Sequence, residues 1–311
     1  MSATPHSPIE VDIVSGFLGA GKTTLIRRLI GEEVCTDRLM LLENEFGVVN
    51  IDGEVLAGTG VKVESILASC ICCSGADTLI GKLTDIALTA APRKLIVEPT
   101  GVAHLSDVRR IFHYPVVRDL YRIRRIVTVV DAANYLIWLR VSREFFYDQI
   151  QFSDLIYVSK ADECPPEQVA GLLELLDAIH PGCPVFTELS YLLAAWNSGV
   201  EKKTQPAVYY PQSGRHGGNF ETLAVESPSG FHREGIRQLL DKVQEGAFGS
   251  VYRIKGSFQD ETGTGFTLDW VGNRYRLIQT ETNERPATRL CVIGRDLDRN
   301  SLNREFARVA E

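Results

Sequence analysis

A glycine-rich turn between an apolar run and a helical run restricts the fold of this chain more than any other feature. The apolar run is Ile9 to Val14, and the helical run is Lys22 to Ile30. Between them, Gly16 to Thr23 satisfies the pattern G-x-x-x-x-G-K-[ST] at every defined position. A strand, this turn and a helix in that order predict a loop that binds nucleotide phosphates. Glycines let backbone N–H groups approach the phosphate, and the helix N-terminus adds partial positive charge.

Two residues of this loop have side chains suited to phosphate chemistry. We expect Lys22 to contact the β- and γ-phosphates and the hydroxyl of Thr23 to bind Mg²⁺, so both are candidate catalytic residues. A glycine-rich loop with an accidental lysine is the alternative, and the flanking strand and helix argue against it. The expected nucleotide contacts are Gly16, Gly19, Ala20, Gly21, Lys22, Thr23 and Thr24.

Apolar runs and helical periods alternate along residues 9–188. Repeated units of this kind predict an α/β fold of the P-loop NTPase type, with a mostly parallel sheet covered by helices on both faces. Further strands are expected at Arg38–Leu42, Lys94–Val97, Arg125–Val130, Leu155–Ser159 and Pro184–Phe186, and further helices at Ala76–Leu88 and Val169–Ile179.

The pattern changes after Ser190. Residues 197–219 show no clean period and indicate a linker or long loop, after which strands grouped with a few helices predict a small α+β domain. The chain has 311 residues, which is more than one compact core usually takes. We therefore expect a P-loop domain at residues 1–195, a linker at 196–219 and a C-terminal α+β domain at 220–311.

Composition and charge exclude some classes of partner. The chain is 44% hydrophobic and 23% charged, with a formal net charge of -7. An acidic balance argues against a general binder of nucleic acid or anionic membranes, which needs clustered lysine and arginine. No window approaches the roughly 20 apolar residues of a membrane span. No secretory signal is visible at the N-terminus, so we expect a cytoplasmic protein.

A second motif follows the strand predicted at Leu155–Ser159. Ser159-Lys160-Ala161-Asp162 resembles the guanine-recognising N-K-x-D, with serine in place of asparagine. The carboxylate of Asp162 can accept hydrogen bonds from guanine N1–H and its 2-amino group, and the Lys160 stem can pack on the base. An ordinary surface loop is the alternative, but the position of the motif several strands after a phosphate loop favours guanine recognition. An ATP-dependent kinase is disfavoured for the same reason.

Glu98-Pro99-Thr100-Gly101 ends the strand predicted at Lys94–Val97. Glu98 can hold Mg²⁺ directly or through water, and the Gly101 N–H can contact the γ-phosphate. This segment is therefore a candidate switch that is ordered by a triphosphate. An ordinary charge at a strand end is the alternative. The residue that orients the attacking water is left open between Glu45, Asp52 and Glu98.

Seven cysteines occur, and three of them lie within Cys70-Ile71-Cys72-Cys73. An odd number with this spacing favours metal or redox chemistry over a disulfide framework, and thiolates bind Zn²⁺ and similar ions well. Three thiols leave one tetrahedral position open, which suits a site that releases its metal. A buried cysteine-rich turn and a redox pair are the alternatives. Glu43 and Glu45 are less certain additional ligands, whereas His104 and His113 favour surface or packing roles.

Together these motifs resemble those of the CobW-like family of P-loop GTPase metallochaperones, relatives of the nickel-inserting GTPases. The resemblance covers nearly the whole chain, and the phosphate loop combined with C-x-C-C is its most specific part. The matching segments are Gly16–Thr24, Glu43–Gly47, Cys70–Cys73, Glu98–Gly101, Val129–Ala132, Ser159–Asp162, Val251–Gly256 and Ile293–Asp298.

The resemblance implies GTP binding, slow GTP hydrolysis and a Zn²⁺, Co²⁺ or similar ion held at Cys70, Cys72 and Cys73. It also implies delivery of that metal to a client metalloprotein or a cofactor-insertion machinery, and it leaves a homodimer open. The runner-up interpretation is a regulatory P-loop GTPase that acts on a partner enzyme and holds its metal for structure.

Two departures from the family pattern stand out. Many members carry a histidine-rich stretch between the domains, but here the corresponding region holds only His216. This makes metal storage or hand-off by histidines doubtful. Val48 stands where many members have an acidic residue, which removes one carboxylate ligand.

Overall fold

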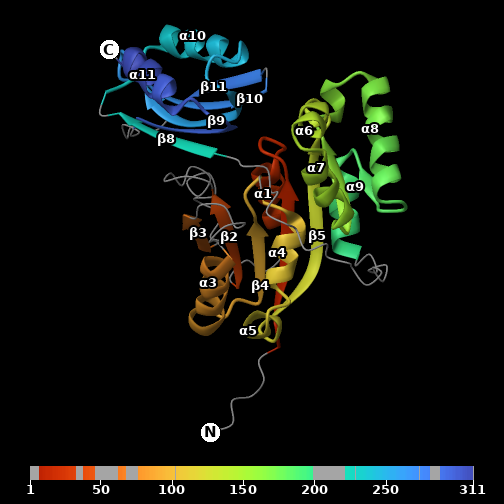
Figure 1. Cartoon of the computed structure of the whole chain (residues 1–311). Coiled ribbons are helices and arrows are strands. Elements are labelled where there is room, and N and C mark those ends of the chain that lie inside the picture. Colours follow the sequence, from red (N-terminus) through yellow and green to blue (C-terminus); the bar gives the residue numbers. More distant parts are fainter. Residues whose placement is uncertain are drawn as a thin grey trace. The chain divides into compact units, whose positions relative to one another are not determined.

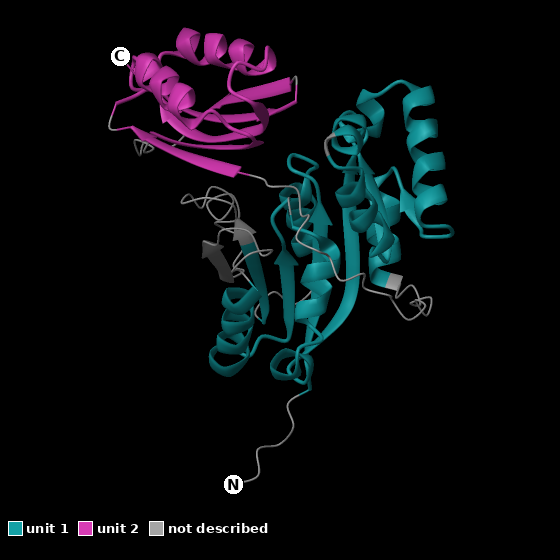
Figure 2. Ribbon diagram, viewed as in Figure 1, with its two compact units in different colours: residues 1–45, 52–217 teal, residues 46–51, 218–311 magenta. Residues whose placement is uncertain are grey.

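In a computed structural model of the chain, the described residues are 7–32, 38–45, 62–67, 76–101, 103–198, 221–227, 229–272, 274–280 and 288–310. They divide into two compact units, one from the described residues up to 198 and one from those beginning at 221 (Figures 1 and 2). Each unit has its own sheet and its own hydrophobic core. No helix in the described ranges is both long enough and apolar enough to cross a bilayer.

The first unit is built on a seven-stranded sheet in the order β3-β2-β4-β1-β5-β6-β7, and every pair of neighbouring strands is parallel. Because β1 lies between β4 and β5, the chain leaves the middle of the sheet when it enters α1. The strands are β1 (Ile9–Gly16), β2 (Leu39–Glu45), β3 (Lys62–Leu67), β4 (Lys94–Glu98), β5 (Tyr121–Asp131), β6 (Leu155–Ser159) and β7 (Val185–Phe186).

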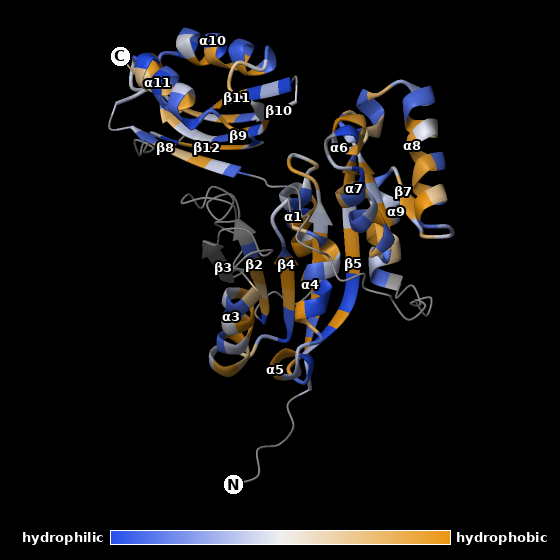
Figure 3. Cartoon of the chain, viewed as in Figure 1, coloured by the Kyte–Doolittle hydropathy of each residue, from blue (hydrophilic) through white to orange (hydrophobic). Residues whose placement is uncertain are grey.

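Helices cover both faces of this sheet. One core joins the sheet to α3, α4 and α5, and a second core joins its other face to α1 and α9. Strands buried on both faces have nearly continuous apolar runs, as in β4, where all five residues are buried. Figure 3 shows the resulting hydrophobic colour along much of β4 and β5. The helices are α1 (Lys22–Glu32), α3 (Ala76–Thr89), α4 (Leu105–Ile111), α5 (Pro115–Arg118), α6 (Tyr135–Val141), α7 (Arg143–Gln151), the short η2 (Ala161–Glu163), α8 (Pro166–Ile179) and α9 (Leu189–Ser198).

The second unit is an antiparallel sheet of five strands in the order β11-β10-β9-β12-β8. Its core joins alternate strand residues to α10 and α11. The burial of β10 alternates along the strand from Phe266 to Val271, as expected where one face of a sheet meets helices and the other does not. The elements are β8 (Glu221–Ser227), α10 (Arg233–Gln244), β9 (Ser250–Gln259), β10 (Gly265–Val271), β11 (Arg274–Gln279), β12 (Thr288–Arg295) and α11 (Arg299–Ala310).

The predicted fold class is confirmed: a P-loop α/β unit with a parallel sheet is followed by a small α+β unit. The sequence prediction missed α4, α5, α6, α7 and α9. Four of these have ten residues or fewer with little visible helical period, and α5 has only one turn. It also ended β2 at Leu42, whereas the strand continues to Glu45 through three polar residues. The boundaries at residues 195 and 219 stay predictions.

Candidate nucleotide-binding site

Three predicted segments lie at one edge of the parallel sheet. The phosphate loop follows β1, the Glu98 segment follows β4, and the Ser159 segment follows β6. Since all of these strands are parallel, their carboxyl ends meet at the same edge, which is where α/β sheets bind ligands. The strand order therefore places Glu98 on one side of the phosphate loop and the Ser159 segment on the other.

The backbone of the phosphate loop requires glycine at its first position. Gly16 has φ of 141°, and a Cβ atom there would lie 2.3 Å from the carbonyl oxygen of Val129 on β5. Gly19 and Gly21 also have positive φ, at 73° and 98°. L side chains rarely adopt these values, so the three glycines let the chain turn sharply between β1 and α1.

Lys22, Thr23 and Glu98 gather on the phosphate side of the site. The Thr23 hydroxyl lies 3.4 and 3.3 Å from the two carboxylate oxygens of Glu98. Lys22 Nζ lies 3.9 Å from Glu98 Oε1 and donates a hydrogen bond of 3.2 Å to the carbonyl of Phe17. A hydroxyl and a carboxylate on neighbouring elements are the hard oxygen ligands that Mg²⁺ prefers, so these residues fit that ion.

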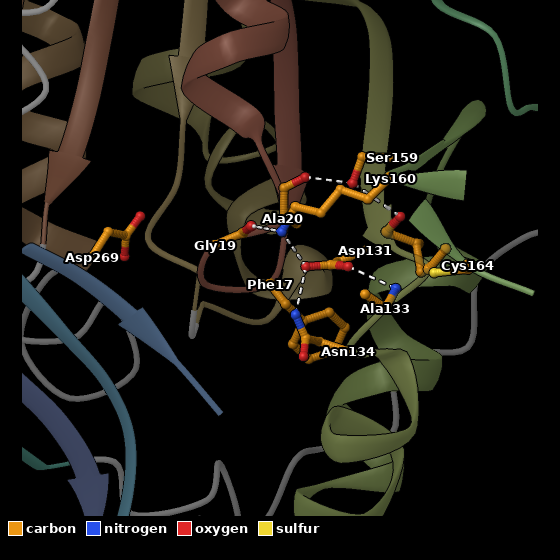
Figure 4. A network of polar contacts seen from close by, with 12 residues as sticks. Phe17, Gly19, Ala20, Asp131, Ala133, Asn134, Ser159, Lys160, Cys164 and Asp269 are labelled. Carbon is orange, nitrogen blue, oxygen red and sulfur yellow. Dashed lines mark hydrogen bonds and ion pairs between the residues drawn. The ribbon is translucent and has the colours of Figure 1, made fainter. Parts of the chain in front are cut away.

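The Ser159 segment contacts the other side of the phosphate loop (Figure 4). The Ser159 hydroxyl donates to the carbonyl of Ala20 at 2.7 Å, and Lys160 Nζ donates to the carbonyl of Gly19 at 3.1 Å. Asp162 lies on η2, directly after this contact, and its side chain is exposed. Ser159, which stands at the asparagine position of the motif, thus joins the two loops by a hydrogen bond.

Asp131, at the end of β5, completes this cluster. Its carboxylate accepts hydrogen bonds from Lys160 Nζ at 2.5 Å, from Asn134 Nδ2 at 2.8 Å and from the backbone N–H of Ala133 at 2.8 Å. The neighbouring strands β5 and β6 are in register at Asp131 and Ser159, which places Asp131 next to Lys160. The side chain of Asp131 is buried, and that of Lys160 is only partly exposed.

A cluster of aromatic rings packs against the phosphate loop at Phe17. The ring of Phe17 stacks on Trp138 and Phe146 at centroid distances of 5.0 and 5.5 Å, and it meets Phe145 edge-on at 5.2 Å. All four rings are buried. Aromatic pairs of this geometry add stabilisation beyond burial, so α6 and α7 hold the loop in place.

The segment after Glu98 also packs closely on the phosphate loop. A Cβ atom at Gly101 would lie 2.6 Å from the backbone nitrogen of Leu18, so only glycine permits this approach. Further along, the buried Gln149 of α7 connects the two regions. Its Nε2 donates to the carbonyl of Ala103 at 2.6 Å, and its Oε1 accepts from the Ser15 hydroxyl at 2.5 Å.

The N-terminus of α4 is held by the same helix. Asp148 Oδ2 accepts from the backbone N–H groups of Leu105 at 2.6 Å and Ser106 at 3.2 Å. Its carboxylate lies 3.7 Å from His104 Nδ1. Burial lowers the pKa of His104, but the hydrogen bond and charge of Asp148, helped by Asp107 and Glu144, outweigh burial and place the pKa above 6.5. His104 thus contacts Asp148, and its ring meets that of Phe145 edge-on at a centroid distance of 4.9 Å.

The predicted transition-metal site lies outside the described residues, since Cys70, Cys72 and Cys73 fall between β3 and α3. Glu43 is buried on β2, in register with Glu98 of β4. Among the residues that the structure describes, no group of three histidine, cysteine or acidic side chains is placed to hold a metal ion. Asp52, Val48, His216 and the side chain of Glu45 also lie outside the described part.

Sequence reasoning gave no role to three residues that the structure places at the site. Asp131 appeared only within a matching family segment, and Phe17 and Gln149 were not singled out. A signal existed for Asp131, because it ends an apolar strand as Glu98 does. Gln149 carried no signal, since its partner Ser15 is 134 positions away.

Comparisons with known proteins agree with this arrangement. A family model described as CobW/HypB/UreG, nucleotide-binding domain, matches residues 10–187. A second, described as the cobalamin synthesis protein cobW C-terminal domain, matches residues 220–310.

Three curated relatives are similar over part of their length. The zinc chaperone YeiR of Escherichia coli (strain K12) is 33% identical over 164 residues, covering 52% of this chain and 50% of the relative. The zinc chaperone CobW of a Sinorhizobium species is 32% identical over 182 residues, or 50% and 51% of the two chains. The zinc-regulated GTPase metalloprotein activator 1 of Dictyostelium discoideum is 25% identical over 304 residues, or 80% and 62%. The match thus spans about half the length of the first two relatives.

Among solved structures, the Zn(II)-bound YjiA GTPase from E. coli matches with 21% identity and a TM-score of 0.47, covering 98% of this chain and 100% of that one.

Proposed function

Because the chain belongs to the CobW/HypB/UreG family of nucleotide-binding proteins, we propose that it binds and hydrolyses GTP and couples this cycle to the transfer of a transition metal. The observation that carries the nucleotide part is the direct hydrogen bonding of the Ser159–Asp162 segment to the carbonyls of Ala20 and Gly19. A base-recognising loop joined in this way to a phosphate loop can hold both ends of one nucleotide.

The residues of the nucleotide site have separate roles in binding and in hydrolysis. Asp162 accepts hydrogen bonds from guanine, while Lys22 places its charge beside the β- and γ-phosphates. Thr23 and Glu98 would hold Mg²⁺, which neutralises charge on the phosphate oxygens during transfer to water. The N–H of Gly101 contacts the γ-phosphate, and the close packing of Gly101 on Leu18 supports that role. The remaining nucleotide contacts are the backbone of Gly16, Gly19, Ala20, Gly21 and Thr24 with Ser159 and Lys160.

The metal part of the proposal rests on the curated relatives, two of which are named zinc chaperones and one a zinc-regulated GTPase metalloprotein activator. We propose Zn²⁺, or Co²⁺ or another transition ion, as the cargo of Cys70, Cys72 and Cys73, with Glu43 as an additional ligand. The receiver is a client metalloprotein or cofactor-insertion machinery in the cytoplasm.

Nucleotide competition and metal titration test the two parts separately. Fluorescent GDP should be displaced by GTP and GDP at concentrations at least tenfold lower than by ATP and ADP, and equal displacement would contradict guanine recognition. Zn²⁺ affinity, measured against a chromophoric chelator, should differ between the protein loaded with a GTP analogue and with GDP. Equal Zn²⁺ affinities in the two nucleotide states would contradict the carrier model.

Cys72→Ser distinguishes the carrier from a GTPase with a structural metal. We expect Cys72→Ser to keep its melting temperature in the presence of a chelator and to lose the nucleotide-dependent change in Zn²⁺ affinity. Cys183→Ser, at a partly buried cysteine between α8 and β7, is the matched control and should retain that change. Unfolding of Cys72→Ser alone would favour a structural metal.

A further inference from the structure

Asp131 is a buried carboxylate whose described contacts are all with hydrogen-bond donors. One oxygen faces the N–H of Ala133, and the other faces both the Asn134 amide and the Lys160 ammonium. The side chain of Asp131 is 1% exposed. Burying a charge is costly unless it is paired and hydrogen-bonded, and this carboxylate meets both conditions through Lys160 and the start of α6.

Lys160 is held at both ends. Its backbone has φ of 56°, a left-handed conformation that is unfavourable for a residue other than glycine. Its ammonium lies between the carboxylate of Asp131 and the carbonyl of Gly19. Strained backbone of this kind persists where the surroundings over-determine it, and it clusters at functional sites. The aliphatic stem of Lys160 is therefore held in one conformation between β6 and the phosphate loop (Figure 4).

We propose that Asp131 is a positioning residue for purine recognition, which fixes Lys160 against the phosphate loop so that its stem forms a ready platform for the base recognised by Asp162. This inference rests on the proposed binding of GTP. Ordering a long lysine side chain costs conformational entropy. Because Asp131 orders Lys160 before the nucleotide binds, this entropy cost does not reduce the free energy of nucleotide binding.

The chemistry requires a carboxylate at residue 131. Asparagine has nearly the same shape, and its carbonyl can still accept from Ala133. Its amide group would then point N–H donors at the donors of Asn134 and Lys160. Asp131→Asn thus removes the attraction for the ammonium with little change in volume.

A double-mutant cycle on the full chain tests the inference, with equilibrium binding of fluorescent GDP as the measurement. We expect Asp131→Asn to weaken GDP binding about tenfold, the size of one charged hydrogen bond. Lys160→Met should weaken it by a similar factor. In the Lys160→Met background, Asp131→Asn should cause no further loss, because Asp131 acts through Lys160.

Two control variants separate positioning from general structure. Asp12→Asn removes an equally buried carboxylate of the same unit, paired with Lys94 at 3.1 Å and with Arg124 at 2.5 Å, in the middle of β1. It should lower the melting temperature and leave the GDP affinity unchanged. Asp131→Glu restores a carboxylate and should recover part of the affinity.

The outcomes distinguish this inference from the proposed function. If Asp131→Asn leaves GDP affinity unchanged, or weakens it equally in the Lys160→Met background, the positioning role is overturned while GTP binding stands. If the unaltered protein binds ADP as tightly as GDP, guanine recognition is overturned, and the cycle with GDP still tests whether Asp131 acts through Lys160. If it binds neither nucleotide, both proposals are overturned.

Discussion

The two sides of the nucleotide site are held in different ways. On the base side, Ser159 and Lys160 contact the phosphate loop directly at 2.7 and 3.1 Å, and Asp131 fixes Lys160 at 2.5 Å. On the phosphate side, Glu98 lies 3.3 Å or more from the Thr23 hydroxyl and 3.9 Å from Lys22. Short charge-assisted contacts fix geometry more strongly than long ones, so the base side is the more rigid frame.

The phosphate-side segment is instead positioned through its flanks. Gly101 packs on Leu18, Ala103 is held by Gln149, and the start of α4 is held by Asp148. The contacts of Gly101 and Ala103 are van der Waals packing and a neutral hydrogen bond, each of modest strength, and the charge-assisted contact of Asp148 lies farther along, at the start of α4. The segment next to Glu98 is thus held mainly by uncharged contacts, whereas the base-side loop is held by an ion pair at Lys160 itself.

The largest expected effect is that of Lys22→Ala on GTP hydrolysis, through the phosphate side of the site. It removes the charge expected beside the β- and γ-phosphates, so single-turnover GTP hydrolysis should fall about 100-fold. GDP binding should weaken less than GTP binding, because the base-side contacts remain. Lys82→Ala on α3 is a control of the same chemistry and should leave both measurements unchanged. Hydrolysis at the original rate in Lys22→Ala would contradict the assignment.

Gly101→Ala should have the next largest effect, and it should alter the phosphate side of the site but not the base side. Its Cβ would lie 2.6 Å from the nitrogen and 3.0 Å from the Cα of Leu18, so the segment must move away from the phosphate loop. We expect affinity for a GTP analogue, measured by calorimetry, to fall about tenfold relative to GDP. Gly81→Ala on α3, where a Cβ meets nothing within 4 Å, should change neither affinity. An equal loss for both nucleotides would show that the segment does not sense the γ-phosphate.

Gln149→Met tests the connection through α7. It leaves the Ser15 hydroxyl and the Ala103 carbonyl without their buried partner, which should lower the free energy of unfolding by about 2 kcal/mol. Urea denaturation measures this loss. Gln151→Met, at an exposed position of the same helix, should cost less than about 0.5 kcal/mol. Equal stability of the two variants would mean that Gln149 does not hold the segment.

The smallest expected effect is a dependence on pH. The pKa of His104 is raised by Asp148, so protonation of this histidine stabilises the folded state. That contribution is complete below pH 6.5 and is lost as the pH rises through the higher folded pKa. His104→Gln should therefore remove part of the fall in melting temperature between pH 6 and pH 8. The exposed His113 provides a control, and His113→Gln should keep the whole fall.

The sequence predicted those parts of the site that are contiguous in the chain. The phosphate loop, the Glu98 segment and the Ser159 segment each carry their chemistry within a few residues after a strand, and parallel strands bring such ends together. The helices α4 to α7 were missed because they are short and show little period. Their contributions to the site, namely Phe145, Asp148 and Gln149, were missed with them.

For this chain, local pattern was enough to predict the class of fold and the glycine-rich turn between β1 and α1, because backbone geometry depends on neighbouring residues. Only the folded structure decided which distant side chains meet. The Ser15–Gln149 bond spans 134 positions and the Lys160–Asp131 bond spans 29, and both depend on the order of strands in the sheet. That order results from packing of the whole unit, which no local period encodes.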